Sequence, residues 1–312
     1  MVKPILAAAA AIALIAAVGG CNGRAAAHAI DYTVTVESVG MQRQYLIHEP
    51  ASDPGAKRPA VLVFHGGGGT ADYMAAKTGF DSLSDAAGFV AVYPVGYDKS
   101  WNDGRGADTA AGAKNIDDIG FVSMIIDRIV ADNAVDPGRV YATGLSNGAM
   151  FTEDLGCRLS GKIAAIAAVA GPMPTADASV CTPTHPMSVL EIHGTTDPIV
   201  PYDGGVVRVT SGRRGPGTSP VLSVDATQQL WRDKNACGPV TTSVLPNTAD
   251  DGTTVTTTVA SCANGSRVEL YSIADGGHTW PDGPQYLPVA IVGKVSHQFD
   301  ASDVIWHFFA GD

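Results

Sequence analysis

The sequence predicts an α/β fold in which helices cover both faces of a mostly parallel central sheet. Residues 59–64 and 88–94 are continuous apolar runs of strand length, as expected for strands buried on both faces. Residues 117–132 instead repeat apolar side chains at helical spacing, with Asp117 or Asp118 placed to cap the first turn. Alternation of such strands and helices is typical of a parallel sheet between two helical layers.

The rest of the chain continues this alternation. Residues 32–37 and 44–48 are expected to form a pair of outer strands. Further strands are expected at 139–143, 162–169, 186–192 and 267–273, a surface hairpin at 240–245 and 253–259, and helices at 149–155, 224–235 and 301–309. The long irregular segment 204–220 is either a lid beside the functional site or a mobile loop.

The first residues indicate export. A basic start is followed by the almost wholly apolar residues 4–18 and then by two glycines, the pattern of a secretory signal that is too short to span a bilayer comfortably. Residues 18–21 resemble a bacterial lipobox, in which Cys21 is diacylated and becomes the mature N-terminus. We therefore expect a signal peptide over 1–20, a lipidated tether over 21–31 and one folded domain over 32–312. An ordinary membrane anchor and a plain secretory cleavage with Cys21 incidental are the alternatives.

The cysteine count agrees with an oxidising compartment. The chain has five cysteines, and setting Cys21 aside leaves the even set Cys157, Cys181, Cys237 and Cys262. Two disulfides have three possible connectivities, of which we favour Cys157–Cys181 and Cys237–Cys262 because each closes one modest loop. Free buried thiols are the alternative. The spacing of Cys and His does not suggest a structural metal site.

The charge balance restricts the partners. The formal net charge of −11 argues against binding to nucleic acid and against adhesion to anionic lipid headgroups. It places no constraint on a neutral ester or sugar. Membrane contact is therefore expected only through a lipid at Cys21.

The segment Gly144-Leu145-Ser146-Asn147-Gly148 lies between an expected strand and an expected helix. A serine on so tight a strand-to-helix turn adopts a strained backbone conformation and exposes its hydroxyl at the sheet edge. Larger side chains at Gly144 and Gly148 would collide with the turn. The pentapeptide alone is a weak signal, so the strand and the helix around it carry the prediction that Ser146 is a nucleophile.

A serine nucleophile needs a base and a third group that orients the base. α/β-Hydrolases supply these groups in the chain order Ser, acid, His, from loops that follow successive strands. Asp197 follows the next strand and is the predicted acid, with Asp203 or a plain turn aspartate as alternatives. His278 follows the last strand and is the predicted base. His297 and His307 also lie downstream, but His307 falls within the terminal helix pattern.

The tetrahedral intermediate needs two hydrogen-bond donors. One is predicted to be the backbone N–H of Asn147, the residue after the nucleophile. The other is assigned to Gly67, with Gly66 and Gly68 as neighbours, because a glycine loop lets the backbone approach a substrate closely. A phosphate-binding loop is the competing interpretation, but no Gly-Lys-Ser/Thr follows. His65 is interpreted as a structural support for this loop, and His193 as structural because its own loop already supplies the acid.

With these motifs in place, the mature chain resembles the exported esterases that include polyhydroxybutyrate depolymerases, feruloyl esterases and acetylxylan esterases. The matching segments are His65-Gly66, Tyr93-Pro94, Ser100-Trp101-Asn102, residues 117–121, residues 140–148, residues 200–205 and residues 277–281. By this resemblance, Ser146, Asp197 and His278 form the triad of an α/β-hydrolase. The implied substrate is a feruloyl or acetyl sugar ester or a short hydroxyalkanoate oligomer, and no metal or organic cofactor is implied.

The sequence also suggests which residues contact the substrate, what kind of ester it is and which rival functions remain. Trp101 and Trp280 are expected to form an apolar wall beside the substrate and Asn102 to donate a hydrogen bond to it, with core packing and a turn role as the alternatives. Depolymerases of solid polyester often carry an extra binding module after a linker, whereas this sequence stops after its terminal helix, which favours a soluble ester. A serine peptidase, an acyltransferase and a catalytically silent binding lipoprotein are the rival functions.

Overall fold

The computed structural model describes residues 29–51, 57–208 and 217–311. The predictions for the signal peptide, for Cys21 and for the middle of segment 204–220 lie outside these residues. The described strands are β1 (Ile30–Ser38), β2 (Met41–Glu49), β3 (Arg58–Phe64), β4 (Val90–Pro94), β5 (Val135–Leu145), β6 (Ala165–Val169), β7 (Ser188–Gly194), β8 (Gly205–Val206), β9 (Pro220–Val221), β10 (Val240–Val244), β11 (Thr254–Ser261) and β12 (Arg267–Ala274). The described helices are α1 (Ala71–Lys77), α2 (Phe80–Ala87), α3 (Ala110–Ala113), α4 (Asp118–Asp132), α5 (Asn147–Arg158), α6 (Thr175–Ala178), α7 (Val224–Lys234), α8 (Val289–Val292) and α9 (Ala301–Ala310), with 3₁₀ turns η1 (Gly106–Asp108) and η2 (Ala263–Gly265).

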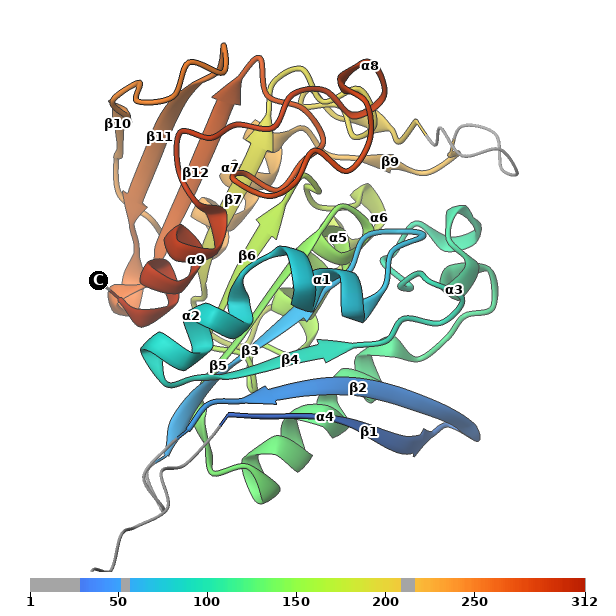
Figure 1. The fold of residues 1–312 in the computed structure, drawn as a ribbon. Coiled ribbons are helices and arrows are strands. Elements are labelled where there is room, and N and C mark those ends of the chain that lie inside the picture. The colour runs from blue at the N-terminus through green and yellow to red at the C-terminus, as the bar shows by residue number, and fades with distance from the viewer. Residues whose placement is uncertain (1–28, 52–56, 209–216, 312) are drawn as a thin grey trace, which may run out of the picture.

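A ten-stranded sheet in the order β1-β2-β4-β3-β5-β6-β7-β12-β11-β10 runs through the molecule (Figure 1). Its central pairs, from β4-β3 to β7-β12, are parallel, whereas β1 and β2 at one edge and β11 and β10 at the other are antiparallel. The carboxyl ends of β3, β5, β7 and β12 therefore meet at one edge of the sheet. In α/β folds, this edge is where ligands bind.

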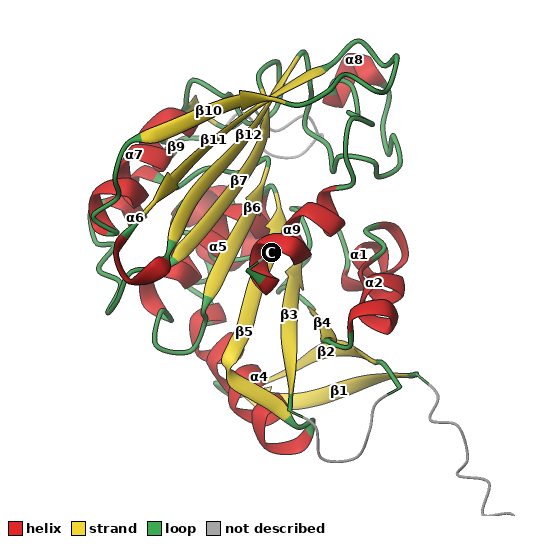
Figure 2. Ribbon diagram, turned by 90° about the vertical axis from the view of Figure 1, so that its left-hand side faces the viewer, coloured by secondary structure: helices red, strands yellow, loops and turns green. Residues whose placement is uncertain are grey.

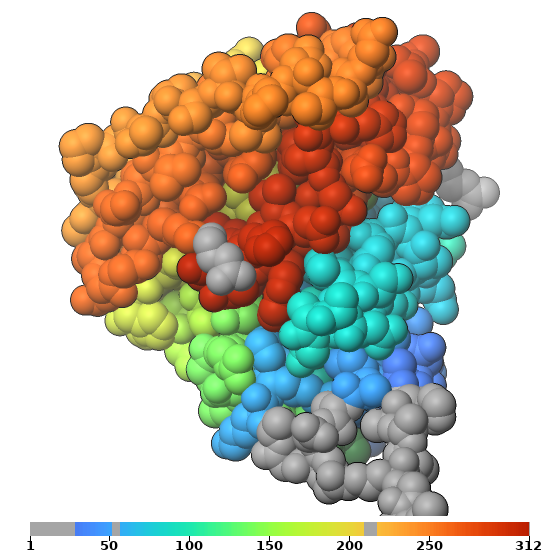
Figure 3. Space-filling model, turned by 60° about the vertical axis from the view of Figure 1, so that its left-hand side comes forward, coloured from blue at the N-terminus to red at the C-terminus, as the bar shows by residue number. Residues whose placement is uncertain are grey.

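Helices cover both faces of the sheet, as predicted (Figure 2). One face packs against α4, α5 and α7 through Phe121, Phe151 and Trp231, which are fully buried. The other face packs against α1, α2 and α9 and contains Met74 and Phe80. In the space-filling view, the dark-red terminal helix lies beside the teal residues of α2 (Figure 3). Strands β4 and β6, which lie between these two layers, are almost wholly apolar because neither face is exposed to water.

Several sequence predictions are confirmed and two are refined. The outer pair is β1 and β2, and Asp117, not Asp118, caps α4 by accepting the Gly120 N–H at 2.8 Å. The hairpin expected at the surface is the β10–β11 edge of the central sheet, because β11 pairs with β12. Helices α1 and α2 were not predicted from the sequence. They have seven and eight residues, which is too short for a clear helical repeat.

The two favoured disulfides are present, Cys157–Cys181 and Cys237–Cys262. The first ties α5, which begins next to Ser146, to the loop before β7, and the second ties the end of α7 to the end of β11. Cross-links of this kind stabilise mainly by restricting the unfolded chain. In the part of the chain that the structure describes, none of the helices is both long enough and apolar enough to cross a bilayer.

Candidate active site

Ser146 occupies a strained turn between β5 and α5. Its backbone angles are φ 58° and ψ −118°, a region that residues with a side chain rarely adopt. A Cβ on Gly144 would lie 2.6 Å from the carbonyl oxygen of Gly148, and a Cβ on Gly148 would lie 2.5 Å from that of Phe64. Both glycines are therefore required by close packing, as the sequence indicated, and the turn carries the Ser146 side chain at the sheet edge.

Asp197 and His278 come together from two loops that are distant in sequence. The Nδ1 of His278 lies 2.7 Å from Oδ2 of Asp197, and both side chains are buried. The other carboxylate oxygen, Oδ1, accepts the backbone N–H groups of Ile199 at 2.7 Å and Val200 at 2.8 Å. Because the carboxylate only accepts, the Nδ1 of His278 carries a proton, and when this is the only proton on the ring, Nε2 is free to accept another.

The electrostatic environment keeps Asp197 ionised. Burial by itself raises the pKa of this carboxyl, but the charge of His278 and the hydrogen bonds from His193 and His278 outweigh burial. The pKa of Asp197 therefore lies below its usual range. An ionised acid at this position orients the imidazole and stabilises the imidazolium that forms when the base takes a proton.

Glycines let the His278 loop pack against its neighbours. A Cβ on Gly277 would lie 2.2 Å from the carbonyl oxygen of Val292, and the His278 N–H donates to the same oxygen at 2.6 Å. The hydroxyl of Tyr286 donates to the carbonyl of His278 at 2.9 Å. A glycine is therefore required at position 277 because two backbone segments approach each other closely there.

The segments that carry Ser146 and His278 lie at the same edge of the sheet, after the parallel strands β5 and β12. Leu145, which precedes the serine, lines one small cavity together with Trp280 and Tyr286 from the histidine loop. Within residues 29–51, 57–208 and 217–311, however, the Ser146 hydroxyl makes no hydrogen bond. The structure therefore joins the acid to the base but not the base to the nucleophile. In proteins without bound substrate, such catalytic hydrogen bonds are often long and tighten only when substrate binds.

The glycine loop after β3 lies against the serine turn. A Cβ on Gly66 would be 3.4 Å from the Cβ of Ser146, and a Cβ on Gly67 would be 3.6 Å from that of Asn147. Among the described residues, the N–H groups of Gly67 and Asn147 have no hydrogen-bond acceptor, whereas the Gly68 N–H donates to Lys99. Gly67 and Asn147 thus offer two free donors on adjacent segments, the arrangement that an oxyanion hole requires.

His65 supports this loop from below. Its Nδ1 lies 2.9 Å from the Gly66 carbonyl, and its Nε2 accepts the Gly96 N–H at 3.0 Å. These two bonds fix the tautomer with the proton on Nδ1, and burial lowers the pKa of the ring. The indole N–H of Trp101 donates to the His65 carbonyl at 2.9 Å. His65 therefore acts as the structural support that the sequence suggested.

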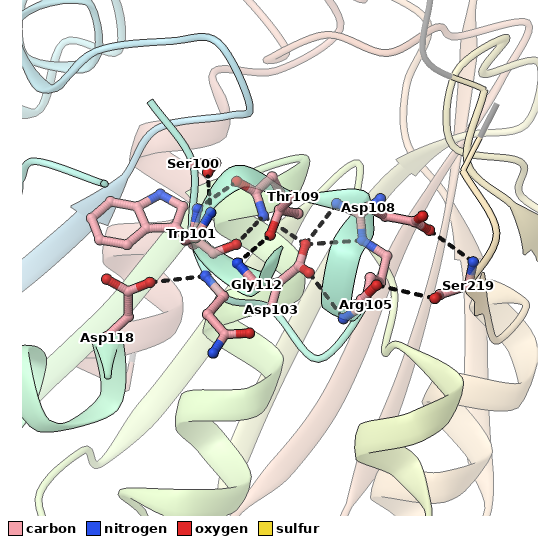
Figure 4. Close-up of polar contacts among 12 residues, drawn as sticks. Ser100, Trp101, Asp103, Arg105, Asp108, Thr109, Gly112, Asp118 and Ser219 are labelled. Atoms are coloured by element: carbon pink, nitrogen blue, oxygen red, sulfur yellow. Dashed lines mark hydrogen bonds and ion pairs between the residues drawn. The ribbon is translucent and has the colours of Figure 1, made fainter. Parts of the chain in front are cut away.

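The segment after β4 is held by polar contacts in which Asp103, Arg105 and Ser219 take part (Figure 4), and it also contacts Asn147. The Asn147 side chain accepts the Trp101 N–H at 2.8 Å and donates to Asp103 at 2.6 Å. Arg105 in turn donates to Asp103 at 2.6 Å, and the Arg105 carbonyl accepts the hydroxyl of Ser219. Asp103 and Arg105 were missed at the sequence level, where only residues 100–102 gave a signal. Their contacts fix the peptide that carries the Asn147 donor.

Comparison with known proteins agrees with this geometry. A model of the esterase PHB depolymerase family matches residues 43–227. The chain belongs to this family. It is 31% identical over 292 residues to a protein of Nocardia uniformis subsp. tsuyamanensis named as esterase NocK. This match covers 90% of this chain and 84% of that protein. It is 29% identical over 252 residues to feruloyl esterase B of Piromyces equi, a match that spans 77% of this chain but only 43% of that protein.

A solved structure supports the fold assignment. An acetyl xylan esterase from Aspergillus awamori superposes with a TM-score of 0.54 at 16% identity, over 80% of this chain and 94% of that one. The sheet order and the helix layers are those of an α/β-hydrolase. The protein is thus a carboxylic ester hydrolase with an α/β-hydrolase fold.

Two of the residues predicted to contact substrate in this esterase are corrected. The Trp101 side chain is fully buried and stacks on Phe151 with ring centroids 5.2 Å apart. It is a core residue, because an indole with one polar atom is readily buried once that atom is hydrogen-bonded. The amide of Asn102 donates to the Ile116 carbonyl at 2.9 Å, and its backbone N–H donates to Asp118. The Asn102 side chain therefore serves the local turn, which was the alternative.

The remaining candidates are Trp280, predicted to contact substrate, and the alternative acid and bases Asp203, His297 and His307. Trp280 is nearly buried, and its indole N–H donates to Ser302 at 3.1 Å, but its ring lines the small cavity next to Leu145. Asp203 is exposed, and among the described residues the ion pair and side-chain hydrogen bond of His278 are made with Asp197 and not with Asp203. His297 is exposed and pairs with Asp282, and His307 lies on α9. Of the predicted acids and bases, only Asp197 and His278 meet.

Proposed function

We propose that Ser146, His278 and Asp197 form the catalytic triad of this esterase. The observation that carries the proposal is the buried hydrogen bond between His278 and Asp197 at the sheet edge where the strained Ser146 turn is located. His278 Nε2 removes the proton from the Ser146 hydroxyl as its oxygen attacks the ester carbonyl. Asp197 holds the ring in the required tautomer and stabilises its charged form.

The N–H groups of Gly67 and Asn147 receive the negative charge of the tetrahedral intermediate. His278 then gives its proton to the departing alcohol, which leaves an acyl group on Ser146. Water, activated by the same imidazole, attacks the acyl group and restores the free serine. Support for this proposal comes from the hydrogen bonds that hold Asp197 and the Asn147 side chain, because donors and charges fixed before the reaction stabilise a transition state most strongly.

The proposed substrates are feruloyl or acetyl esters of sugars or short hydroxyalkanoate oligomers. Support comes from relatives named as feruloyl and acetylxylan esterases. The test is a panel assay of the purified enzyme on methyl ferulate, acetylated xylan, hydroxybutyrate oligomers and short nitrophenyl esters. We expect ester hydrolysis well above that of matched amides, together with covalent labelling of Ser146 by a fluorophosphonate probe. Faster amide cleavage, transfer of the acyl group to an added alcohol, or an unlabelled serine would each support a rival function instead.

We further propose that the enzyme is exported and anchored through a lipid on Cys21, with a signal peptide over 1–20, a tether over 21–31 and the catalytic domain over 32–312. The lipobox-like residues 18–21 support the anchor, and the two disulfides agree with an oxidising compartment. In a bacterium that processes lipoproteins, a clickable fatty acid should label the native chain and leave a Cys21→Ser chain unlabelled. Equal labelling of both chains, or none of either, would reject the anchor.

A further inference from the structure

A buried polar cluster lies behind the Asp197 loop, and the mechanism above does not use it. Glu191 and His193 are two residues apart on β7, so their side chains share one face of the strand, and both side chains are fully buried. From α7, the Gln228 amide donates to Glu191 at 3.3 Å and the Trp231 indole donates to Glu153 of α5 at 2.6 Å. A buried cluster of this kind is costly unless its charges are balanced.

His193 contacts the catalytic acid and the turn that carries it. Its Nε2 donates to the Val200 carbonyl at 3.0 Å and lies 3.4 Å from Oδ2 of Asp197, the oxygen that also bonds His278. The backbone N–H of Val200 donates to Oδ1 of Asp197 at 2.8 Å. The ring, the Val200 peptide and the carboxylate thus form a closed set of contacts. This set fixes the position from which Asp197 reaches His278.

The other ring nitrogen faces a second buried carboxylate. Nδ1 of His193 lies 3.8 Å from Oε1 of Glu191, and neither atom has a hydrogen-bond partner. Burial lowers the pKa of His193, but the nearby carboxylates of Asp197 and Glu191 outweigh burial and raise the pKa to about 9. Burial and the neighbouring Glu191 raise the pKa of Glu153 well above its usual range.

We infer that His193 is a positioning residue for the catalytic acid: as an imidazolium paired with Glu191, it fixes the Asp197 carboxylate and keeps it anionic for His278. This inference rests on the proposed role of Asp197. The titratable and charged groups around His193 are Glu191 on its own strand, Asp197 in its loop with His278 beyond it, the ring of Tyr202, Glu153 on α5 and Asp225 near the start of α7.

The kinetic test separates the charge of His193 from its hydrogen bond. In His193→Gln, an amide can still donate to the Val200 carbonyl, but the positive charge is gone. The full negative charge of Asp197 then acts on His278 and favours its protonated form, so the acid limb of the kcat/KM profile on nitrophenyl acetate should move to higher pH. Glu191→Gln removes the group that keeps the proton on His193, and the limb should move the same way. His193→Leu also removes the donor, and kcat should fall by about 10²-fold because the acid is misplaced.

Controls distinguish positioning from a merely structural role. The exposed His185 provides a matched His→Gln change, which should leave the acid limb in place. A structural histidine would lower the melting temperature and the activity of the His193→Gln enzyme without moving its acid limb. If neither His193→Gln nor Glu191→Gln moves the limb, the inference is wrong.

A second readout needs neither catalysis nor a His193 variant. In the Ser146→Ala protein, ¹⁵N NMR should find both ring nitrogens of His193 protonated from pH 6.5 to 8. Because the folded pKa is raised, the stability that this group contributes is fully present below about pH 6.5 and is lost as the pH rises through about 9. A neutral ring at pH 7 would overturn the inference. If the Ser146→Ala protein instead kept esterase activity, the proposed function would fail while the NMR result on His193 would still stand.

Discussion

Replacement of Ser146 by alanine is expected to lower kcat by about 10⁴-fold or more while leaving the fold intact. The hydroxyl oxygen is the proposed attacking atom, and among the described residues it makes no hydrogen bond that stabilises the folded state. An alanine can adopt the same strained turn, since the side chain keeps its Cβ. The residual rate would come from the free N–H donors and from substrate binding.

The measurement is kcat on a nitrophenyl ester, with circular dichroism and the melting temperature as checks on folding. Ser179, which is exposed on the surface, provides a matched Ser→Ala control that should keep full activity. Near-normal turnover by a folded Ser146→Ala enzyme would remove Ser146 from the mechanism.

Most strands of the sheet could be predicted from the sequence, because strands buried on both faces are rich in apolar residues. Residues 59–64 and 88–94 illustrate this in β3 and β4. The sequence did not predict helices α1 and α2, because helices of so few turns show no clear repeat of apolar residues. It also could not show that β11 joins the central sheet, because that depends on pairing with β12, which no local pattern encodes.

Some features of the candidate active site could likewise be predicted from the sequence, whereas others could not. Chain order and loop position predicted Asp197 and His278, and the structure brings these two side chains together, because loops that follow parallel strands lie at the same edge of the sheet. The direction of a side chain was not available from order alone. Trp101 lies in the expected loop, yet its indole points into the core and supports His65. The contact between His193 and Asp197 also could not be predicted from the sequence, because it forms only when the turn at residues 197–200 packs against β7.

Replacement of Asp197 by asparagine is expected to reduce kcat by about 10⁴-fold, the effect known for this change in serine triads. The asparagine oxygen can still accept the N–H groups of Ile199 and Val200, which directs its NH₂ toward Nδ1 of His278. Two donors cannot bond each other, so the ring must shift its proton to Nε2. That nitrogen can then no longer take the proton of Ser146.

Asp203→Asn is the matched control for Asp197→Asn, because Asp203 is exposed in the same loop and was the rival candidate for the acid. Both variants should fold, as judged by melting temperature, but only the change at Asp197 should impair turnover of a nitrophenyl ester. The ¹⁵N spectrum of the Asp197→Asn protein should report a proton on Nε2 of His278 in place of Nδ1. Activity within about tenfold of the wild type, or loss of activity in Asp203→Asn instead, would mean that the hydrogen bond between Asp197 and His278 holds the loop together but does not prepare the base.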